Sequence, residues 1–409
     1  MVSSVTVHGS SGENIRIGFD KTSNFLLAQQ VAAQINAGIA AGKIVTESDQ
    51  HGTPPTVPAG VTGAFVQTET PLFVMPPGYT IDLVTKRGSA VVLSSGAPDE
   101  TILSGSKTDL TFLAASGSGT VVAGGGNNRL DVGGSGNWLL YTGGGNDIIA
   151  ALGTGNATIG AGGGHNAILL GGGKDVISST GDDTIVGGSG AETIDASGAR
   201  RDFVQGNGSN LVFIGGTGGA TIVGGTGSDT YLGSAGSTGK QFIVGGSGGN
   251  NFLFAGDGVA TLVGGGNQDQ LFAYGDRHQL LIAGSGNETL SAAFSTGNDK
   301  LKAGSGNDLL VGGLGADTFV GGSGNATVSA GFGNQVFEFI NHQAGGTELV
   351  QNIFDPASIK IDLKGYGHGA INEALASQTV SHGSVTIGLS DGTKITFEDV
   401  TSLNRSNFT

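Results

Sequence analysis

The chain has 409 residues, of which 80 are glycine and none is cysteine, and its formal net charge is -15. The lack of cysteine excludes disulfides and thiolate metal sites, and the negative charge argues against binding to nucleic acid or anionic lipid. No stretch approaches the roughly 18 apolar residues of a transmembrane helix, so no membrane insertion is expected.

The glycine content predicts a fold that turns sharply at regular intervals. The three-residue period of collagen is missing, and short β-branched runs such as Thr-Ile-Val supply apolar surface that a disordered linker would lack. The expected class is therefore all-β, a parallel β-solenoid of the β-roll or β-helix kind, with a small α+β amino-terminal domain and a carboxy-terminal cap.

Residues 1–78 form the predicted amino-terminal cap or interaction domain. Strands are expected at residues 4–8 and 14–19, and a helix at residues 24–41. Its apolar residues recur every fourth position on one helical face: Leu27, Val31, Ile35 and Ile39. The first residues have no basic segment followed by an apolar core, so no Sec-type signal peptide is expected there. Six of the 8 prolines follow within this region and predict an irregular linker.

Residues 79–335 carry a repeat of about nine residues, a period typical of β-helix proteins. Its clearest copies are GGTGSDTYL at residues 224–232 and GGLGADTFV at residues 312–320. Each copy predicts a glycine-rich turn and then a short strand whose middle residue, Tyr231 or Phe319, points inward. Two copies would make one coil, so successive turns should lie on opposite edges of the solenoid.

Both copies match the pattern G-G-x-G-x-D-x-U-x and so resemble the hemolysin-type calcium-binding nonapeptide repeats of secreted RTX β-roll proteins. The resemblance implies Ca²⁺ bound between stacked turns through aspartate carboxylates and backbone carbonyls, a donor set that suits this hard cation. It also implies type I secretion to the outside or the surface of a Gram-negative bacterium, by an uncleaved carboxy-terminal signal.

The turn aspartates are the candidate metal ligands. Because turns alternate between edges, a shared ion would join turns eighteen residues apart, and Asp299 and Asp317 have this spacing. Asp308 lies on the opposite edge, where its partner Ala326 supplies no carboxylate. Further candidates face turns without a partner carboxylate: Asp147, Asp175, Asp183, Asp229 and Asp269. An alternative is that all these aspartates only form turns.

Residues 336–409 lose the repeat and are expected to cap the solenoid and to contain the type I secretion signal. A helix is predicted at residues 370–377, and a hairpin at residues 385–389 and 394–397 around the Asp391-Gly392 turn.

No catalytic motif emerges. No H-E-x-x-H zinc sequence is present, and the G-x-S-x-G match at residues 388–392 falls in the predicted hairpin turn. We therefore expect no enzyme but a secreted structural protein that self-assembles head to tail into a filament, surface layer or biofilm matrix. A cell-surface polysaccharide is a second expected partner. The alternative is a monomeric calcium-dependent adhesin or binding module with its ligand site in residues 1–78. A polysaccharide lyase or epimerase is a third and weaker hypothesis, since aromatic and basic residues are few.

Overall fold

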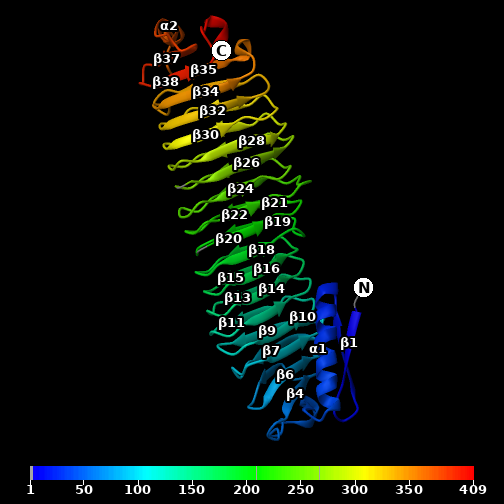
Figure 1. Cartoon of the computed structure of the whole chain (residues 1–409). Helices are drawn as coiled ribbons and strands as arrows, with labels where there is room; N and C mark the ends of the chain where they lie inside the picture. Colours follow the sequence, from blue (N-terminus) through cyan, green and yellow to red (C-terminus); the bar gives the residue numbers. More distant parts are fainter. Residues whose placement is uncertain (1–2, 209, 267) are drawn as a thin grey trace. The chain divides into compact units, whose positions relative to one another are not determined.

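The computed structural model describes residues 3–208, 210–266 and 268–409, and its contacts divide the chain into two compact units, Met1–Gly208 and Ser209–Thr409. In each unit the chain winds as a parallel β-solenoid, with one strand of each coil in either of two ladders (Figure 1). We call these the even ladder, which holds the even-numbered solenoid strands and β3, and the odd ladder, which begins at β5.

In the first unit the even ladder pairs its strands in parallel from one coil to the next. Its members are β3 (Ile44–Ser48), β4 (Thr62–Gln67), β6 (Tyr79–Val84), β8 (Glu100–Ser104), β10 (Gly119–Ala123), β12 (Trp138–Tyr141), β14 (Ala157–Ala161), β16 (Asp175–Ser179) and β18 (Glu192–Asp195). The odd ladder is parallel as well. Its members are β5 (Leu72–Val74), β7 (Gly88–Leu93), β9 (Thr108–Ala114), β11 (Arg129–Val132), β13 (Ile148–Ala151), β15 (Ala167–Leu170), β17 (Thr184–Val186) and β19 (Arg201–Gln205).

The second unit repeats this arrangement. Its even ladder contains β20 (Leu211–Ile214), β22 (Thr230–Leu232), β24 (Phe252–Phe254), β26 (Gln270–Gly275), β28 (Thr289–Ser295), β30 (Asn307–Val311), β32 (Asn325–Gly331) and β34 (Thr347–Ile353). Its odd ladder contains β21 (Gly219–Val223), β23 (Gln241–Val244), β25 (Ala260–Val263), β27 (Leu280–Ile282), β29 (Lys300–Lys302), β31 (Thr318–Val320), β33 (Val336–Ile340) and β35 (Lys360–Lys364).

The middle residue of each short strand points into the solenoid, as predicted. Tyr231 and Phe319 are each 2% exposed. Equivalent rings of successive coils stack inside: Phe213 lies on Tyr231 with centroids 5.6 Å apart, and Phe319 lies on Phe337 at 5.5 Å. Since strands of adjacent coils are paired residue by residue, identical faces stack, and the core of each unit is a column of mainly apolar side chains.

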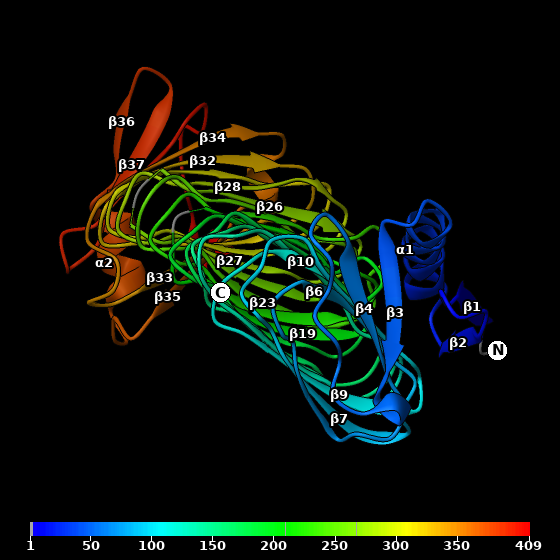
Figure 2. The same ribbon diagram turned by 90° about the horizontal axis from the view of Figure 1, so that it is seen from below.

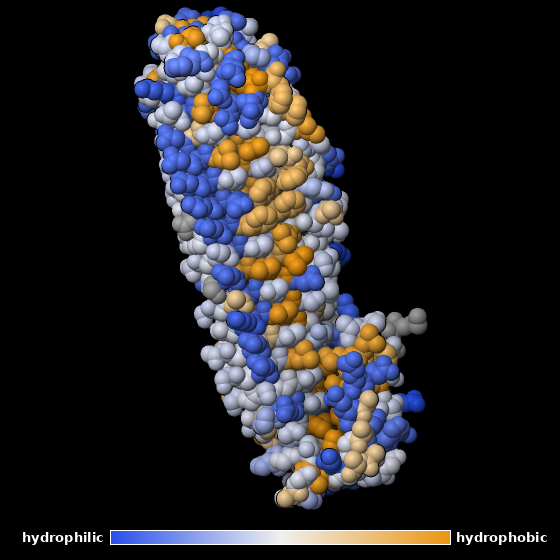
Figure 3. Space-filling view, viewed as in Figure 1, coloured by the Kyte–Doolittle hydropathy of each residue, from blue (hydrophilic) through white to orange (hydrophobic). Residues whose placement is uncertain are grey.

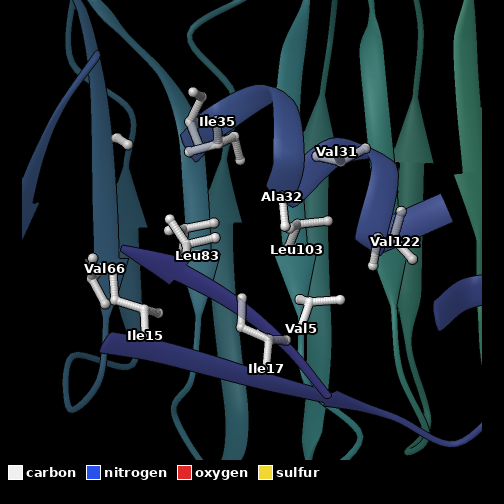
Figure 4. Close-up of a cluster of buried hydrophobic side chains, with 14 of the residues drawn as sticks. Val5, Ile15, Ile17, Val31, Ala32, Ile35, Val66, Leu83, Leu103 and Val122 are labelled. Atoms are coloured by element: carbon white, nitrogen blue, oxygen red, sulfur yellow. The ribbon is translucent and has the colours of Figure 1, made fainter. Parts of the chain in front are cut away.

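The amino-terminal elements cover the outer face of the even ladder in the first unit. Strands β1 (Ser3–His8) and β2 (Asn14–Phe19) form an antiparallel hairpin, and helix α1 (Thr22–Ala40) packs against it. Figure 4 shows Val31 and Ile35 of α1 facing Leu83 and Leu103 of the ladder. Figure 2 shows the same elements outside β3 and β4. The predicted apolar face of the helix is confirmed, because it forms one buried cluster with apolar side chains on the outer face of the ladder.

The carboxy-terminal elements close the last coil of the second unit. Strand β38 (Lys394–Phe397) adds in parallel to β34, and β37 (Ser384–Gly388) and β36 (Thr379–Ser381) follow it in an antiparallel meander. Phe408 bridges to Ile361 of β35. The predicted helix and hairpin are confirmed as α2 (Ala370–Ala376) and β37–β38. Short 3-10 helices occur at η1 (Asp49–His51), η2 (Pro356–Ser358) and η3 (Arg405–Asn407).

The parallel ladders extend beyond the predicted solenoid range of 79–335 at both ends. They begin at β3 and β5 and reach β35, so at the amino-terminal end only about the first forty residues stand outside the coils. The predicted boundary followed the glycine repeat, which these outer coils lack. Their prolines lie in the turns between strands, where a missing backbone N–H costs no ladder hydrogen bond.

The outer face of the even ladder in the second unit carries aromatic side chains. Phe252 lies 5.2 Å from Phe272 and Phe254 lies 5.5 Å from Tyr274, measured between ring centroids, and Phe294 is 64% exposed. Figure 3 shows apolar side chains gathered over these strands, with hydrophilic side chains along the adjoining turns. Among the described residues, no helix has the length and apolar character that crossing a membrane requires.

Candidate calcium-binding turns

The eight predicted aspartates all lie at the end of a turn, just before or at the start of a strand, and their side chains are buried. None is more than 5% exposed. Charged groups are rarely buried to this extent unless they are paired or bind a metal. Their surroundings therefore decide what they can bind.

Each of these carboxylates accepts a hydrogen bond from a backbone N–H in the preceding coil. Asp317 accepts from the N–H of Asp299 at 2.8 Å, and Asp299 accepts from the N–H of Gln279 at 2.8 Å. Asp299 and Asp317 therefore lie in adjacent coils, as their eighteen-residue spacing predicts, while an ion shared between them stays a prediction. The remaining six accept in the same way from Asn128, Ala157, Asn166, Leu211, Asn251 and Glu288.

The second carboxylate oxygen distinguishes two groups of turns. In Asp229, Asp308 and Asp317 it accepts the N–H of the glycine four residues earlier, at 3.0, 2.7 and 2.8 Å. Asp269 bonds Gly265 in the same way, and Asp183 accepts from the hydroxyl of Ser179 at 2.7 Å. A further group has a buried Oδ2 that finds no hydrogen-bond partner among the described residues: Asp147, Asp175 and Asp299.

Burial raises the pKa of most of these carboxyl groups. The pKa of Asp317 rises to about 6 because burial disfavours the charged form, and the negative charge of Asp299 adds to the rise. Burial also raises the pKa values of Asp147, Asp175, Asp183, Asp229 and Asp299. A bound cation would compensate this cost, since it replaces the lost hydration and neutralises the repulsion between coils.

Residues other than the predicted aspartates complete the same columns. Asn128, Asn166, Asn251, Gln279 and Gln335 continue the ladder with amide groups, and Gln335 accepts from the N–H of Asp317 at 2.7 Å. Seven other buried acids were missed: Asp82, Glu100, Glu192, Asp202, Glu288, Glu338 and Glu348. The expectation that Asp175 and Asp183 face no partner carboxylate is therefore wrong, because Glu192 is in register with Asp175 and Asp202 accepts the N–H of Asp183. Glu192 and Glu288 could have been predicted from the sequence, because each follows a glycine-rich turn at the position that aspartate occupies in the repeat.

The donor set fits Ca²⁺ best at Asp175, whose buried Oδ2 has no hydrogen-bond partner among the described residues. At Asp147 and Asp299 the hydroxyls of Thr142 and Ser295 lower the pKa of the carboxyl group. Within the described ranges, no three His, Cys, Asp or Glu side chains gather tightly enough to hold a metal on their own. Backbone carbonyls of the turns and water would have to supply the remaining ligands. That these particular aspartates bind the ion stays a prediction.

Comparison with known families identifies the repeat. The RTX calcium-binding nonapeptide repeat (4 copies) matches residues 176–200, 243–277 and 295–328, which include Asp183, Asp269, Asp299, Asp308 and Asp317. Comparison with curated proteins found no match. The matched repeats coincide with coils of parallel strands whose turns present buried carboxylates. The chain is therefore a parallel β-solenoid that carries RTX calcium-binding nonapeptide repeats at residues 176–200, 243–277 and 295–328.

Proposed function

We propose that this chain is a secreted extracellular structural protein, which self-assembles head to tail and whose coils are consolidated by Ca²⁺. RTX-repeat proteins are typically secreted, and solenoids of this kind typically support structure or binding and not catalysis. Export would place the chain outside the cell, where millimolar calcium can fill its turns. The carboxy-terminal residues 336–409 would then serve both as the cap and as the export signal.

The observation that carries self-assembly is the presence of two different exposed edge strands. Within the described chain, β5 pairs only with β7, and its Leu72 and Val74 are 47% and 57% exposed. Strand β36 pairs only with β37 in the described ranges, and its Val380 is 57% exposed. Unpaired strand edges with exposed apolar side chains favour pairing with another chain.

Contact between these edges of two copies would be heterologous, because β5 of one copy would meet β36 of another. Heterologous contacts that do not close produce open chains of subunits. Head-to-tail filaments are therefore the expected product, and a sheet or layer would require a further lateral contact. The exposed aromatic face of β24, β26 and β28 is suited to such a contact.

Negative-stain electron microscopy of the full-length protein, with millimolar Ca²⁺ and with chelator, tests this proposal. Filaments should form with Ca²⁺ and be lost in Val74→Lys and in Val380→Lys, because a lysine on an edge strand opposes strand addition. Leu26→Lys is the matched control, since Leu26 is 53% exposed on helix α1 and belongs to neither edge strand. Single particles under every condition would reject self-assembly.

A cavity in the amino-terminal region supports the alternative, a calcium-dependent adhesin or binding module. It has a volume of about 520 Å³ and is lined by polar groups of the β1–β2 hairpin, of β3, of η1 and of the segment after β4, among them Glu13, Arg16, Ser48, His51 and Thr68. Hydroxyl, amide and guanidinium groups suit an acidic polysaccharide. Binding of uronic-acid oligosaccharides that is lost in Arg16→Gln, by a chain that stays monomeric, would favour this reading.

A further inference from the structure

The odd ladder of the second unit ends at β35, and residues 404–409 lie across its outer edge (Figure 1). We call these residues the closing segment. Phe408 pairs in parallel with Ile361 of β35, and the N–H of Thr409 donates to the carbonyl oxygen of Ile361 at 3.0 Å. Among the described residues, this single bridged pair is the strand pairing that covers the outer edge of β35.

The closing segment is otherwise tied to its surroundings mainly by single hydrogen bonds. These bonds join Lys360 to Ser406, Asn407 to Ile359 and Arg405 to Asn372, at 2.7, 3.4 and 3.3 Å. The first and the third are exposed to solvent, where water can replace them. The segment can therefore leave the edge without disrupting the ladder beneath it.

Phe408 closes the apolar interior of the second unit. The inward residues of the last three odd strands are Phe319, Phe337 and Ile361, which are 2%, 1% and 0% exposed. Phe408 is in register with Ile361 and 9% exposed, so its ring adds one more layer to this column. An inward phenylalanine on an added strand is thus what the end of the column accepts.

Strand β5 presents the same feature at the first edge of the odd ladder. Its middle residue, Phe73, is 5% exposed and begins the inward column that continues with Val92 and Phe112. Both β5 and residues 407–409 are therefore three-residue edge segments with a central inward phenylalanine. The closing segment resembles the strand with which a following copy would begin.

We propose that the outer edge of β35 is the docking site for β5 of a second copy, and that the closing segment occupies this site until assembly displaces it. Phe73 of the arriving copy takes the place of Phe408 over Ile361. One bridged pair is exchanged for up to three, the number that β5 makes with β7, and the odd ladder continues in parallel from copy to copy. The inference rests on the proposed self-assembly, but it uses the β35 edge, whereas the contact proposed above uses β36.

The closing segment has the advantage of belonging to the same chain as its site. A tethered competitor acts at an effective concentration on the order of millimolar. An isolated copy therefore stays closed, and β5 of a second copy displaces the segment only when copies are crowded. The segment keeps dilute chains apart and protects an edge that would otherwise pair without control.

Electron microscopy tests the β35 edge once the β36 edge is blocked by Val380→Lys, which alone should leave single particles. Phe408→Ser in the same chain should restore filaments in millimolar Ca²⁺, because it frees the edge for β5. A further Val74→Lys should abolish them again. Phe354→Ser is the matched control and should restore nothing, since Phe354 is 65% exposed and lies outside the closing segment and the edge strands.

A reversible lock tests the same edge within one polypeptide. The chain has no cysteine, so Asp362→Cys and Thr409→Cys introduce a single pair. These positions follow Ile361 and Phe408 by one residue each, so their Cα atoms are about 4.8 Å apart, within the range of a disulfide. Added to Phe408→Ser/Val380→Lys, the pair should prevent filaments when oxidised and allow them when reduced.

The outcomes separate this inference from the contact through β36. Filaments of Phe408→Ser/Val380→Lys without filaments of the wild type would mean that the β36 contact fails while the β35 site stands. Single particles of Phe408→Ser/Val380→Lys would overturn the β35 site even if the wild type polymerises. Deletion of residues 404–409 in the Val380→Lys chain guards against misfolding of the serine variant, because it frees the same edge and should polymerise as well.

Discussion

In the turns of Asp229, Asp269, Asp308 and Asp317, one carboxylate accepts backbone N–H groups from two directions. Asp317 accepts from Asp299 in the preceding coil and from Gly313 in its own turn, at 2.8 Å each. An aspartate is needed there even without an ion, because asparagine offers only one acceptor oxygen. Asp175 differs, since only its Oδ1 is used, by Ala157 at 2.7 Å, and its Oδ2 has no partner in the described chain.

We therefore expect the same substitution, aspartate to asparagine, to change stability in opposite directions at Asp317 and at Asp175. In chelator, Asp317→Asn should lower the free energy of unfolding by about 1 to 3 kcal/mol, because the N–H of Gly313 loses its buried acceptor. Asp175→Asn should be neutral or stabilising, since it removes an uncompensated buried charge. Chemical denaturation of both variants measures the difference, and equal losses would contradict these assignments.

At the scale of the coil, glycine is required where turns of adjacent coils touch. A Cβ added at Gly173 would lie 2.1 Å from the carbonyl oxygen of Gly155, whereas at its neighbour Gly172 the nearest atom would be 3.4 Å away. Neither residue has a positive φ, so the requirement at Gly173 is one of space.

Gly173→Ala should therefore lower the free energy of unfolding by about 1 to 3 kcal/mol through overpacking. Gly172→Ala, its matched control, should change it by no more than about 0.5 kcal/mol. Thermal unfolding of the two variants side by side makes the comparison. A tolerated Gly173→Ala would show that the coils can separate without cost.

Helix α1 is held by its apolar face and by a few hydrogen bonds, such as that from the Asn24 amide to the carbonyl of Ala123 at 2.8 Å, so its attachment can be weakened selectively at the apolar face. Ile35 is 3% exposed in the cluster with Leu83 and Leu103, whereas Leu26 is 53% exposed on the same helix. Ile35→Ala should cost about 2 to 5 kcal/mol of docking energy, and Leu26→Ala should cost little. Hydrogen exchange should speed up across residues 3–40 while the solenoid strands keep their protection. Loss of protection throughout the first unit would mean that α1 is integral to the coils.

The repeat could be predicted from sequence because each position has one physical role. Glycine sets the turns, the middle apolar residue fills the interior, and an eighteen-residue spacing brings Asp299 to Asp317. The carboxy-terminal helix and hairpin were equally predictable, since the Asp391-Gly392 turn and flanking apolar residues act locally.

The remaining features depend on contacts between distant segments. Outward apolar residues such as Leu83 and Leu103 alternate with inward ones, so the sequence does not show that α1 covers them. The coils before residue 79 lack the glycine repeat, and only their register reveals them. The backbone N–H of Gly322 lowers the pKa of Glu348 in the next coil, and no local sequence motif shows that these residues are neighbours.

At the scale of the whole molecule, buried acids make stability depend on pH and on cations. Burial raises the pKa values of Asp202 and Asp317 to about 6 and of Glu288 and Glu348 to about 8. Their folded-state pKa values lie above those of the unfolded chain, so the native state binds more protons. Stability is then fully present near pH 4 and is lost as pH rises toward 8.

The most direct test of this account is thermal unfolding of the full-length chain between pH 5 and pH 8, in chelator and in millimolar Ca²⁺, with Mg²⁺ at the same ionic strength as control. In chelator or Mg²⁺ the unfolding temperature should fall as pH rises, because the buried carboxyls lose their protons. In Ca²⁺ that fall should disappear, with the largest gain at pH 8. Unfolding temperatures at pH 8 that are equal with Ca²⁺ and with chelator would contradict the claim that these turns are calcium sites.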